Sequence, residues 1–344
     1  MPTVAVDLRS DTSTRPTPAM RAAIAEADVG DEQIREDPTV NRLCEAVAER
    51  LGKEAAVFLP SGTMCNAVAI ANHTRPGEAI AAHRHAHIIR FESGGPAALA
   101  GVLVEQLEGD RGHFSADDLR HVATRGNAYI PRMSLVSLEQ THNLAGGTVW
   151  PLDQWDEVCL VAHERGAAVH VDGARLFNAV IATGTDAARW ATPVDTVWVD
   201  FTKGLGAPLG AVLSGPADWI EAAWRWKHRL GGALRQAGMM AAGCLYALEH
   251  HVDRLADDHA RAQRLADGLE AVGMAVERPV ETNIVFFDPV PAGVGPGDLC
   301  ERLAEEGVGM GALGPRVRAV TNLNVDDEGI DQALDAVAKV VAGV

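Results

Sequence analysis

The chain has 344 residues, of which 47% are hydrophobic and 22% charged, and its formal net charge is −17. This composition is typical of a globular protein. The length is sufficient for one large domain and a smaller one. The negative charge argues against a nucleic-acid partner, because binding to a phosphate backbone needs clustered lysine and arginine. No apolar run approaches the roughly 20 residues that span a membrane, so no membrane partner is expected.

Cysteine, histidine and the N-terminal residues restrict the class of protein further. The five cysteines are scattered without a CxxC pair, so we expect reduced thiols in a cytoplasmic protein. The N-terminal residues carry neither a basic region nor an apolar core, and no signal peptide is expected. The histidines of His83-Arg-His-Ala-His87 lack a partnering cysteine or glutamate pattern, and HExxH is absent. We therefore predict no metal site.

The first half of the chain alternates apolar strands with helices. Residues 7–16 are polar and form either a solvated arm or a segment that closes over a site. Thr17 is suited to cap a helix that runs through residue 27. The apolar spacing predicts further helices over 40–51 and 153–165, and strands over 55–59, 78–82, 134–138 and 168–172.

The second half begins with two more strands, near residues 198 and 211. The pattern then predicts helices over 216–229, 231–248, 250–272, 297–306 and 327–341, and strands over 282–287 and 317–323. Strands separated by helices favour a largely parallel sheet wrapped in helices. We predict an α/β fold with a mostly parallel central sheet in a large domain over residues 1–248. A smaller α+β domain is predicted over residues 249–344.

Two residues at strand ends indicate the chemistry. Lys203 follows the apolar strand near residue 198 and stands in a turn of small residues. A lysine there is either an exposed turn residue or a desolvated nucleophile that forms a Schiff base. Asp172 ends the preceding predicted strand. Enzymes that use pyridoxal phosphate (PLP) need such a pair, because the lysine holds the cofactor as an imine and the aspartate keeps the pyridine nitrogen protonated.

Other strand ends offer groups that suit the same cofactor. Ser61, Gly62 and Thr63 follow the strand at 55–59 and begin a helix. Backbone amides at such a helix start bind phosphate, although any N-capped helix resembles this arrangement. His87 follows the strand at 78–82, where its imidazole either lies over a cofactor ring or is a structural residue.

With these residues in place, the chain resembles the L-threonine aldolase family, which includes low-specificity and L-allo-threonine aldolases. These are fold-type I PLP enzymes of the β-eliminating lyase group. The resemblance covers nearly the whole chain and is densest before residue 240. It is carried by LRSDTST at 8–14, GDEQIREDPTVN at 30–41, PSGTMCN at 60–66, EQTHNLAGG at 139–147, HVDGAR at 170–175, TKGL at 202–205, RQAG at 235–238 and RAVTNLNV at 318–325.

The resemblance implies retro-aldol cleavage of L-threonine or L-allo-threonine to glycine and acetaldehyde. Lys203 would carry PLP, Asp172 would pair with its ring nitrogen, His87 would stack on its face, and Ser61, Gly62 and Thr63 would hold its phosphate. The substrate carboxylate would be bound by Ser10, Arg175 and Arg318, with Arg175 also near the cofactor, because arginine forks match carboxylates. The base that takes the β-hydroxyl proton would be His87, His142 or a water molecule held by them.

The resemblance also implies a homodimer or homotetramer with active sites at the subunit interface, where Arg235 would approach a neighbouring cofactor. Tyr129 aligns where many members carry a histidine near the substrate's β-substituent. Ile34 replaces a usual tyrosine, Arg35 a common glycine, and His228 a frequent lysine. These departures leave the preferred substrate and its β-carbon stereochemistry open.

Three other functions remain open at this point. A PLP-dependent β-eliminating lyase or dehydratase needs the same aspartate and lysine. An aminotransferase needs them too and differs in forming pyridoxamine. A non-catalytic binding protein on this scaffold would be expected to lose the lysine or the arginines, and both are retained.

Overall fold

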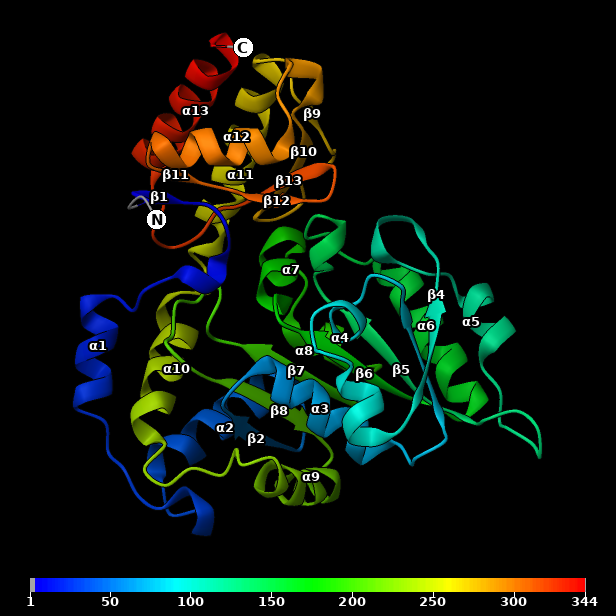
Figure 1. Cartoon of the computed structure of the whole chain (residues 1–344). Coiled ribbons are helices and arrows are strands. Elements are labelled where there is room, and N and C mark those ends of the chain that lie inside the picture. Colours follow the sequence, from blue (N-terminus) through cyan, green and yellow to red (C-terminus); the bar gives the residue numbers. More distant parts are fainter. Residues whose placement is uncertain (1–3, 344) are drawn as a thin grey trace.

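The computed structural model describes residues 4–343 and contains a seven-stranded central sheet, visible in the lower part of Figure 1. The strand order is β2-β8-β7-β6-β5-β3-β4, and β8 is antiparallel to both β2 and β7, whereas all other neighbouring pairs are parallel. The predicted mostly parallel sheet is therefore confirmed. The strands are β2 (Ala55–Leu59), β3 (Ala79–His83), β4 (Leu103–Leu107), β5 (Met133–Glu139), β6 (Ala168–Gly173), β7 (Thr196–Asp200) and β8 (Ala211–Gly215).

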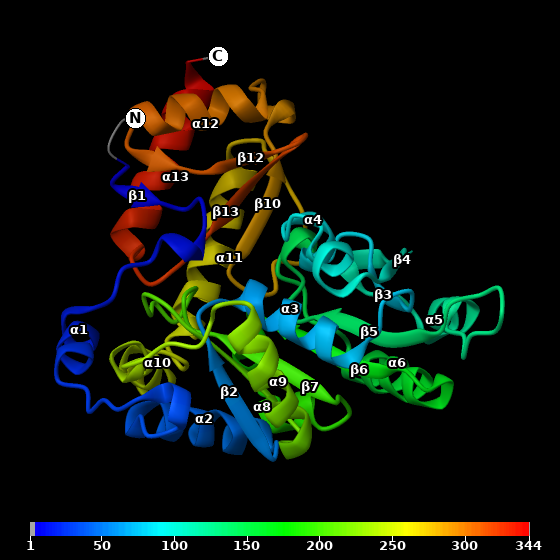
Figure 2. The same ribbon diagram turned by 60° about the horizontal axis from the view of Figure 1, so that its bottom comes forward.

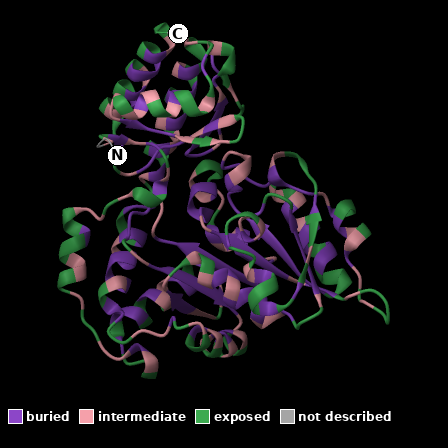
Figure 3. Ribbon diagram, viewed as in Figure 1, coloured by how far each residue is buried: buried purple, intermediate pink, exposed green. Residues whose placement is uncertain are grey.

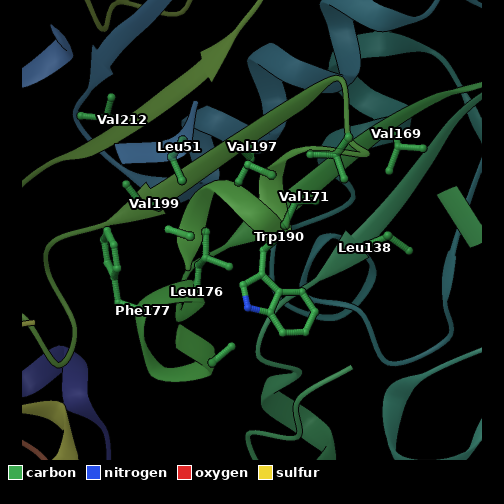
Figure 4. Close-up of a cluster of buried hydrophobic side chains, with 14 of the residues drawn as sticks. Leu51, Leu138, Val169, Val171, Leu176, Phe177, Trp190, Val197, Val199 and Val212 are labelled. Carbon is green, nitrogen blue, oxygen red and sulfur yellow. The ribbon is translucent and has the colours of Figure 1, made fainter. Parts of the chain in front are cut away.

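Successive side chains of these strands pack on opposite faces of the sheet. In β7, Val197 and Val199 join one apolar cluster, whereas Trp198 joins another on the other face. The first cluster includes α2 (Pro38–Leu51), α5 (Ala116–Val122), α6 (Leu152–Arg165), α7 (Leu176–Thr183), α8 (Ala187–Ala191) and α10 (Gly238–His250), and the second includes α3 (Gly62–His73) and α9 (Ala217–Arg229). Figure 4 shows part of the first cluster around Trp190. Burial on both faces explains the continuous apolar runs in the sequence.

A second core lies in the C-terminal part of the chain, at the top of Figures 1 and 3. An antiparallel sheet there has the order β12-β13-β10-β9, and α11 and α12 pack on it, while α13 packs on these two helices and on the β1–β11 pair. The N-terminal strand β1 joins this region by pairing with β11, and Figure 2 shows β1 beside α13 in the same region. The elements are β1 (Val6–Asp7), α11 (Leu255–Ala271), β9 (Ala275–Val276), β10 (Ile284–Asp288), α12 (Pro296–Glu305), β11 (Val308–Gly309), β12 (Gly311–Leu313), β13 (Arg316–Val320) and α13 (Asp327–Ala342).

Helix α11 contributes to both cores, because Leu255 packs in the first and Ala262 in the second. The division of the chain after residue 248 stays a prediction.

Most predicted elements are present, and the differences have identifiable structural causes. Helix α1 (Pro18–Ala25) begins as predicted, with Thr17 Oγ1 accepting from the Met20 amide at 3.2 Å. The helix predicted from residue 231 begins instead at Gly238, because the preceding segment binds the turn at Glu32. There the Leu234 amide donates to Glu32 Oε2 at 2.8 Å. Strand β4 is absent from the prediction because it is an edge strand with mostly exposed side chains.

Within the described residues, no helix combines the length and the apolar character that crossing a membrane requires. All five cysteines are free thiols. Residues 1–3, which belong to the segment considered for a signal peptide, lie outside the described part of the chain.

Candidate active site

The carboxyl ends of the parallel strands meet at one edge of the central sheet, where ligands bind in folds of this kind. A cavity of about 630 Å³ opens at this edge. Its walls also include Ser10 from the N-terminal segment and Arg318 from β13, so the cavity lies between the two cores. The residues predicted from the sequence that line it are Ser10, Ser61, Gly62, Thr63, His87, Asp172, Arg175, Lys203 and Arg318.

Lys203 stands in the turn that follows β7. Its ammonium forms an ion pair with Asp200, the last residue of that strand, and lies 5.7 Å from the centre of the Trp198 ring. The turn is fixed by hydrogen bonds from the Gly206 amide and from Thr14 Oγ1 to the Lys203 carbonyl, both at 3.0 Å. The backbone therefore holds the lysine while its amine faces the cavity.

Asp172 is buried at the end of β6. Its Oδ2 accepts from Asn66 Nδ2 at 2.8 Å and its Oδ1 from the Ala174 amide at 3.1 Å. Burial, and then the nearby Glu139 carboxylate, raise the pKa of Asp172 above its ordinary value. A positively charged ligand group beside this carboxylate would favour its ionised form.

His87 begins α4 (His87–Arg90) at the wall of the cavity. Its Nδ1 lies 2.9 Å from Glu92 Oε1, and its backbone amide donates to Glu139 Oε2 at 2.8 Å. Burial alone would lower the pKa of His87, but the hydrogen bond with Glu92 and the charges of Asp172 and Glu139 outweigh it and raise the pKa. The imidazole is thus held in one orientation beside Asp172.

The start of α3 forms another wall of the cavity. Ser61 caps the helix by accepting from the Met64 amide at 3.3 Å, so the first-turn amides of Gly62 and Thr63 have no carbonyl partner within the helix. Gly62 packs directly on Trp198, since a β-carbon there would lie 2.6 Å from Cζ3 of the indole. These amides and the helix dipole suit an anionic ligand.

The two arginines of the cavity differ in their partners. Arg175 is buried and binds Asp11 through both arms of its fork, with Nε–Oδ2 and Nη2–Oδ1 distances of 2.8 and 2.7 Å. Arg318 donates to Asn143 Oδ1 and to the Arg9 carbonyl, each at 3.1 Å. Burial, and then the neighbouring Arg175, lower the pKa of Arg318. Arg318 is therefore the arginine less committed to a carboxylate of the protein itself.

Three predicted site residues are not brought to this cavity. His142 is buried and faces a second cavity of about 440 Å³, where burial lowers its pKa to about 3. Tyr129 is 95% exposed at the tip of a loop. Arg235 is exposed and pairs with Asp31 at 2.8 Å. His142 therefore lies away from the cavity that Lys203 lines, and its role as the base stays a prediction.

Sequence reasoning missed several polar residues that support the cavity. Glu139 and Asp200 end buried strands, so the rule that identified Asp172 also applies to them. Asn66 and Glu92 carry no such signal, because helix packing and a turn bring them to Asp172 and His87. Asp11 lies in the polar segment that was interpreted as either solvated or closing over a site. Its burial against Arg175 supports the second alternative.

A metal ion also has potential ligands at this edge, although none was predicted. Ligand atoms of His87, Glu92 and Asp172 lie within 4.8 Å of one another. The same atoms take part in hydrogen bonds of 2.8–2.9 Å among themselves and with Asn66. Their arrangement is therefore accounted for by the protein's own contacts.

Comparison with known proteins identifies relatives over most of the chain. The model of the beta-eliminating lyase family matches residues 7–290. The chain is 40% identical over 327 residues to the low specificity L-threonine aldolase of Escherichia coli. The aligned region covers 94% of this chain and 95% of that protein.

Solved structures show the same fold. The threonine aldolase of Leishmania major has a TM-score of 0.84 at 19% identity and covers 97% of this chain and 99% of that one. The N-succinyldiaminopimelate aminotransferase of Mycobacterium tuberculosis has a TM-score of 0.75 at 19% identity, and the match covers 98% of this chain and 93% of that one. The expected fold-type I architecture is confirmed, and it is shared by enzymes with different reactions.

Proposed function

The chain belongs to the beta-eliminating lyase family, and on this premise we propose that it is a PLP-dependent aldehyde-lyase that cleaves L-threonine or L-allo-threonine to glycine and acetaldehyde. The observation that carries the proposal is the meeting of Lys203, Asp172 and the start of α3 around one cavity. The names of the relatives favour the aldolase reaction over others that this fold supports.

The donor set of the cavity suits PLP. Lys203 offers an amine for the cofactor's aldehyde carbon, Asp172 a carboxylate for its ring nitrogen, and His87 a flat ring for stacking. The first-turn amides of Gly62 and Thr63, with Ser61, suit the phosphate. When bound, PLP supplies an electron-poor ring that accepts the electron pair of a bond broken at the α-carbon of an amino acid.

Substrate orientation is the task we assign to Ser10, Arg318 and Arg175. Arg318 would bind the α-carboxylate, and Arg175, already paired with Asp11, would contribute through its remaining Nη1 or by fixing the N-terminal segment that carries Ser10. Holding the carboxylate would fix the orientation of the α-carbon and so determine which of its bonds breaks.

A base must take the β-hydroxyl proton when the Cα–Cβ bond breaks. Between the two histidines considered, His87 faces the cavity and His142 faces the neighbouring one. We therefore assign this role to His87, in its neutral form, directly or through a water molecule.

Quaternary structure and location are also proposals. Arg235 and Tyr129 are exposed in the single chain, which supports a homodimer or homotetramer in which they approach a neighbouring cavity. The free cysteines favour the cytoplasm.

Product analysis tests the reaction. The purified protein with PLP is expected to be yellow and to release glycine and an aldehyde from L-threonine, L-allo-threonine or L-phenylserine. Lys203→Ala should abolish turnover, whereas Lys339→Ala, which changes an exposed lysine paired with Glu306, should retain it. Arg318→Ala should raise KM strongly, and an unchanged KM would remove Arg318 from the carboxylate site.

The alternative function is β-elimination, which the description of the matching family favours. Release of ammonia and a keto acid, with no glycine, would select this function and contradict the aldolase.

A further inference from the structure

Asp200 lies three residues before Lys203 and has a carboxylate that the proposed reaction leaves without a task. Its side chain is 3% exposed, and Oδ2 accepts from the Lys203 ammonium. Oδ1 accepts from the amide and the hydroxyl of Thr202, each at 3.0 Å. Both carboxylate oxygens of Asp200 therefore accept hydrogen bonds, and these hold the carboxylate beside the Lys203 nitrogen.

The other carboxylates of the cavity are engaged elsewhere. Asp172 accepts from Asn66 and Ala174, and Glu139 accepts from the backbone amides of His87 and Asn143. Asp11 binds the guanidinium of Arg175. Among the described residues, Asp200 is thus the carboxylate that pairs with Lys203.

We propose that Asp200 is the counter-ion of the Lys203 nitrogen and keeps this nitrogen protonated both before and after it bonds to the cofactor. The inference rests on the proposed function. When an ammonium condenses with an aldehyde, a carbon–nitrogen double bond replaces the carbon–oxygen bond, and the oxygen leaves as water with two of the nitrogen's protons. The positive charge stays on the nitrogen, so one carboxylate stabilises both forms.

The protonated linkage is the more electrophilic one, because the positive nitrogen draws electrons from the carbon that an incoming substrate amine attacks. Asp200 would therefore act as a positioning residue for the exchange of Lys203 with substrate. It acts through Lys203 and needs no contact with the substrate.

Several other groups share this environment and contribute to its charge. Trp198 also faces the ammonium with its ring, at 5.7 Å. The titratable and charged groups that line the same cavity or interact with Lys203 or Asp200 are Asp11, Cys65, His87, Glu139, Asp172, Arg175, Cys244 and Arg318. Each of these groups is present in both wild type and Asp200→Asn, so the comparison between the two proteins isolates the Asp200 carboxylate.

A pH titration of the holoenzyme spectrum tests the proposal. Protonated and unprotonated linkages absorb at different wavelengths, so the midpoint between them reports the proton on the Lys203 nitrogen. In Asp200→Asn, which preserves the shape and loses the charge, we expect the midpoint to fall by ~1–3 pH units. Thr202→Val keeps the carboxylate and is expected to shift the midpoint less. Asp200→Glu, which also keeps the charge, should lie closer to wild type than Asp200→Asn.

The outcomes separate the two proposals. If the wild-type linkage is present at Lys203 but its midpoint is the same in Asp200→Asn, Asp200 is not the counter-ion and only this inference fails. If wild type forms no linkage at Lys203 with PLP, the proposed function fails and this inference falls with it. A lowered midpoint in Asp200→Asn, together with a near-normal midpoint in Asp200→Glu, supports the inference.

Discussion

Gly62→Ala is expected to disturb the start of α3, because Gly62 lies against the benzo ring of Trp198. The added β-carbon would lie 2.6 Å from Cζ3 and 3.0 Å from Cζ2, and closer still to Cη2. The indole has little freedom to withdraw, since it is 2% exposed and its Nε1 donates to Asn66 Oδ1 at 2.8 Å. Overpacking of this kind costs about 1–3 kcal/mol of the free energy of unfolding.

A double-mutant cycle measures this clash by urea unfolding. Trp198→Phe shortens the ring, so Gly62→Ala should cost less in that background than in wild type. Gly297→Ala in α12 is the matched control, because none of the described residues comes within 4 Å of its added carbon. PLP affinity should fall in Gly62→Ala, since the amides proposed for phosphate must shift. An equal loss of stability in both backgrounds would refute the reasoning.

Two further predictions concern buried charges. Glu32→Gln leaves Lys227 buried without its counter-ion and should lower the free energy of unfolding in urea by ~3–5 kcal/mol. The control Glu221→Gln, in an exposed pair with Arg35, should lower it by under ~1 kcal/mol. Similar losses of stability in the two variants would contradict this prediction. Glu92→Gln should lower the pKa of His87 in a histidine NMR titration, because it removes the carboxylate whose hydrogen bond raises this pKa. Because folding raises this pKa, the stabilising contribution of His87 is full below 6.5 and is lost as pH rises through the folded value. An unchanged titration curve would remove Glu92 as the cause.

The edge of the sheet was predictable, because Asp172 and Lys203 each follow an apolar strand and parallel strands end together. The orientations and partners of individual side chains in the site were not predictable. His142 follows β5 closely in the sequence, but spacing does not determine which way a side chain points in a turn, and its ring faces another cavity. The partner of Arg175 is Asp11, 164 residues away, and this pairing depends on how the N-terminal segment crosses the fold.

The fold shows the same division between local and long-range information. Strands such as β2 and β7 were predicted because burial on both faces requires continuous apolar residues. Strand β4 was not predicted from the sequence, because its exposed edge position permits charged and polar residues, which interrupt the apolar run. The first turn of α10 was predicted too early because a contact with Glu32, about 200 residues away, holds the preceding segment out of the helix.

The most direct test of the proposed PLP site is to find which lysine carries the cofactor. The chain has four lysines, Lys53, Lys203, Lys227 and Lys339, and Lys203 is the one that lines the cavity. Borohydride reduction of the holoenzyme, followed by peptide mass spectrometry, reads the attachment site. We expect the reduced cofactor on Lys203 alone. Its presence on another lysine, or on none, would show that Lys203 does not hold PLP.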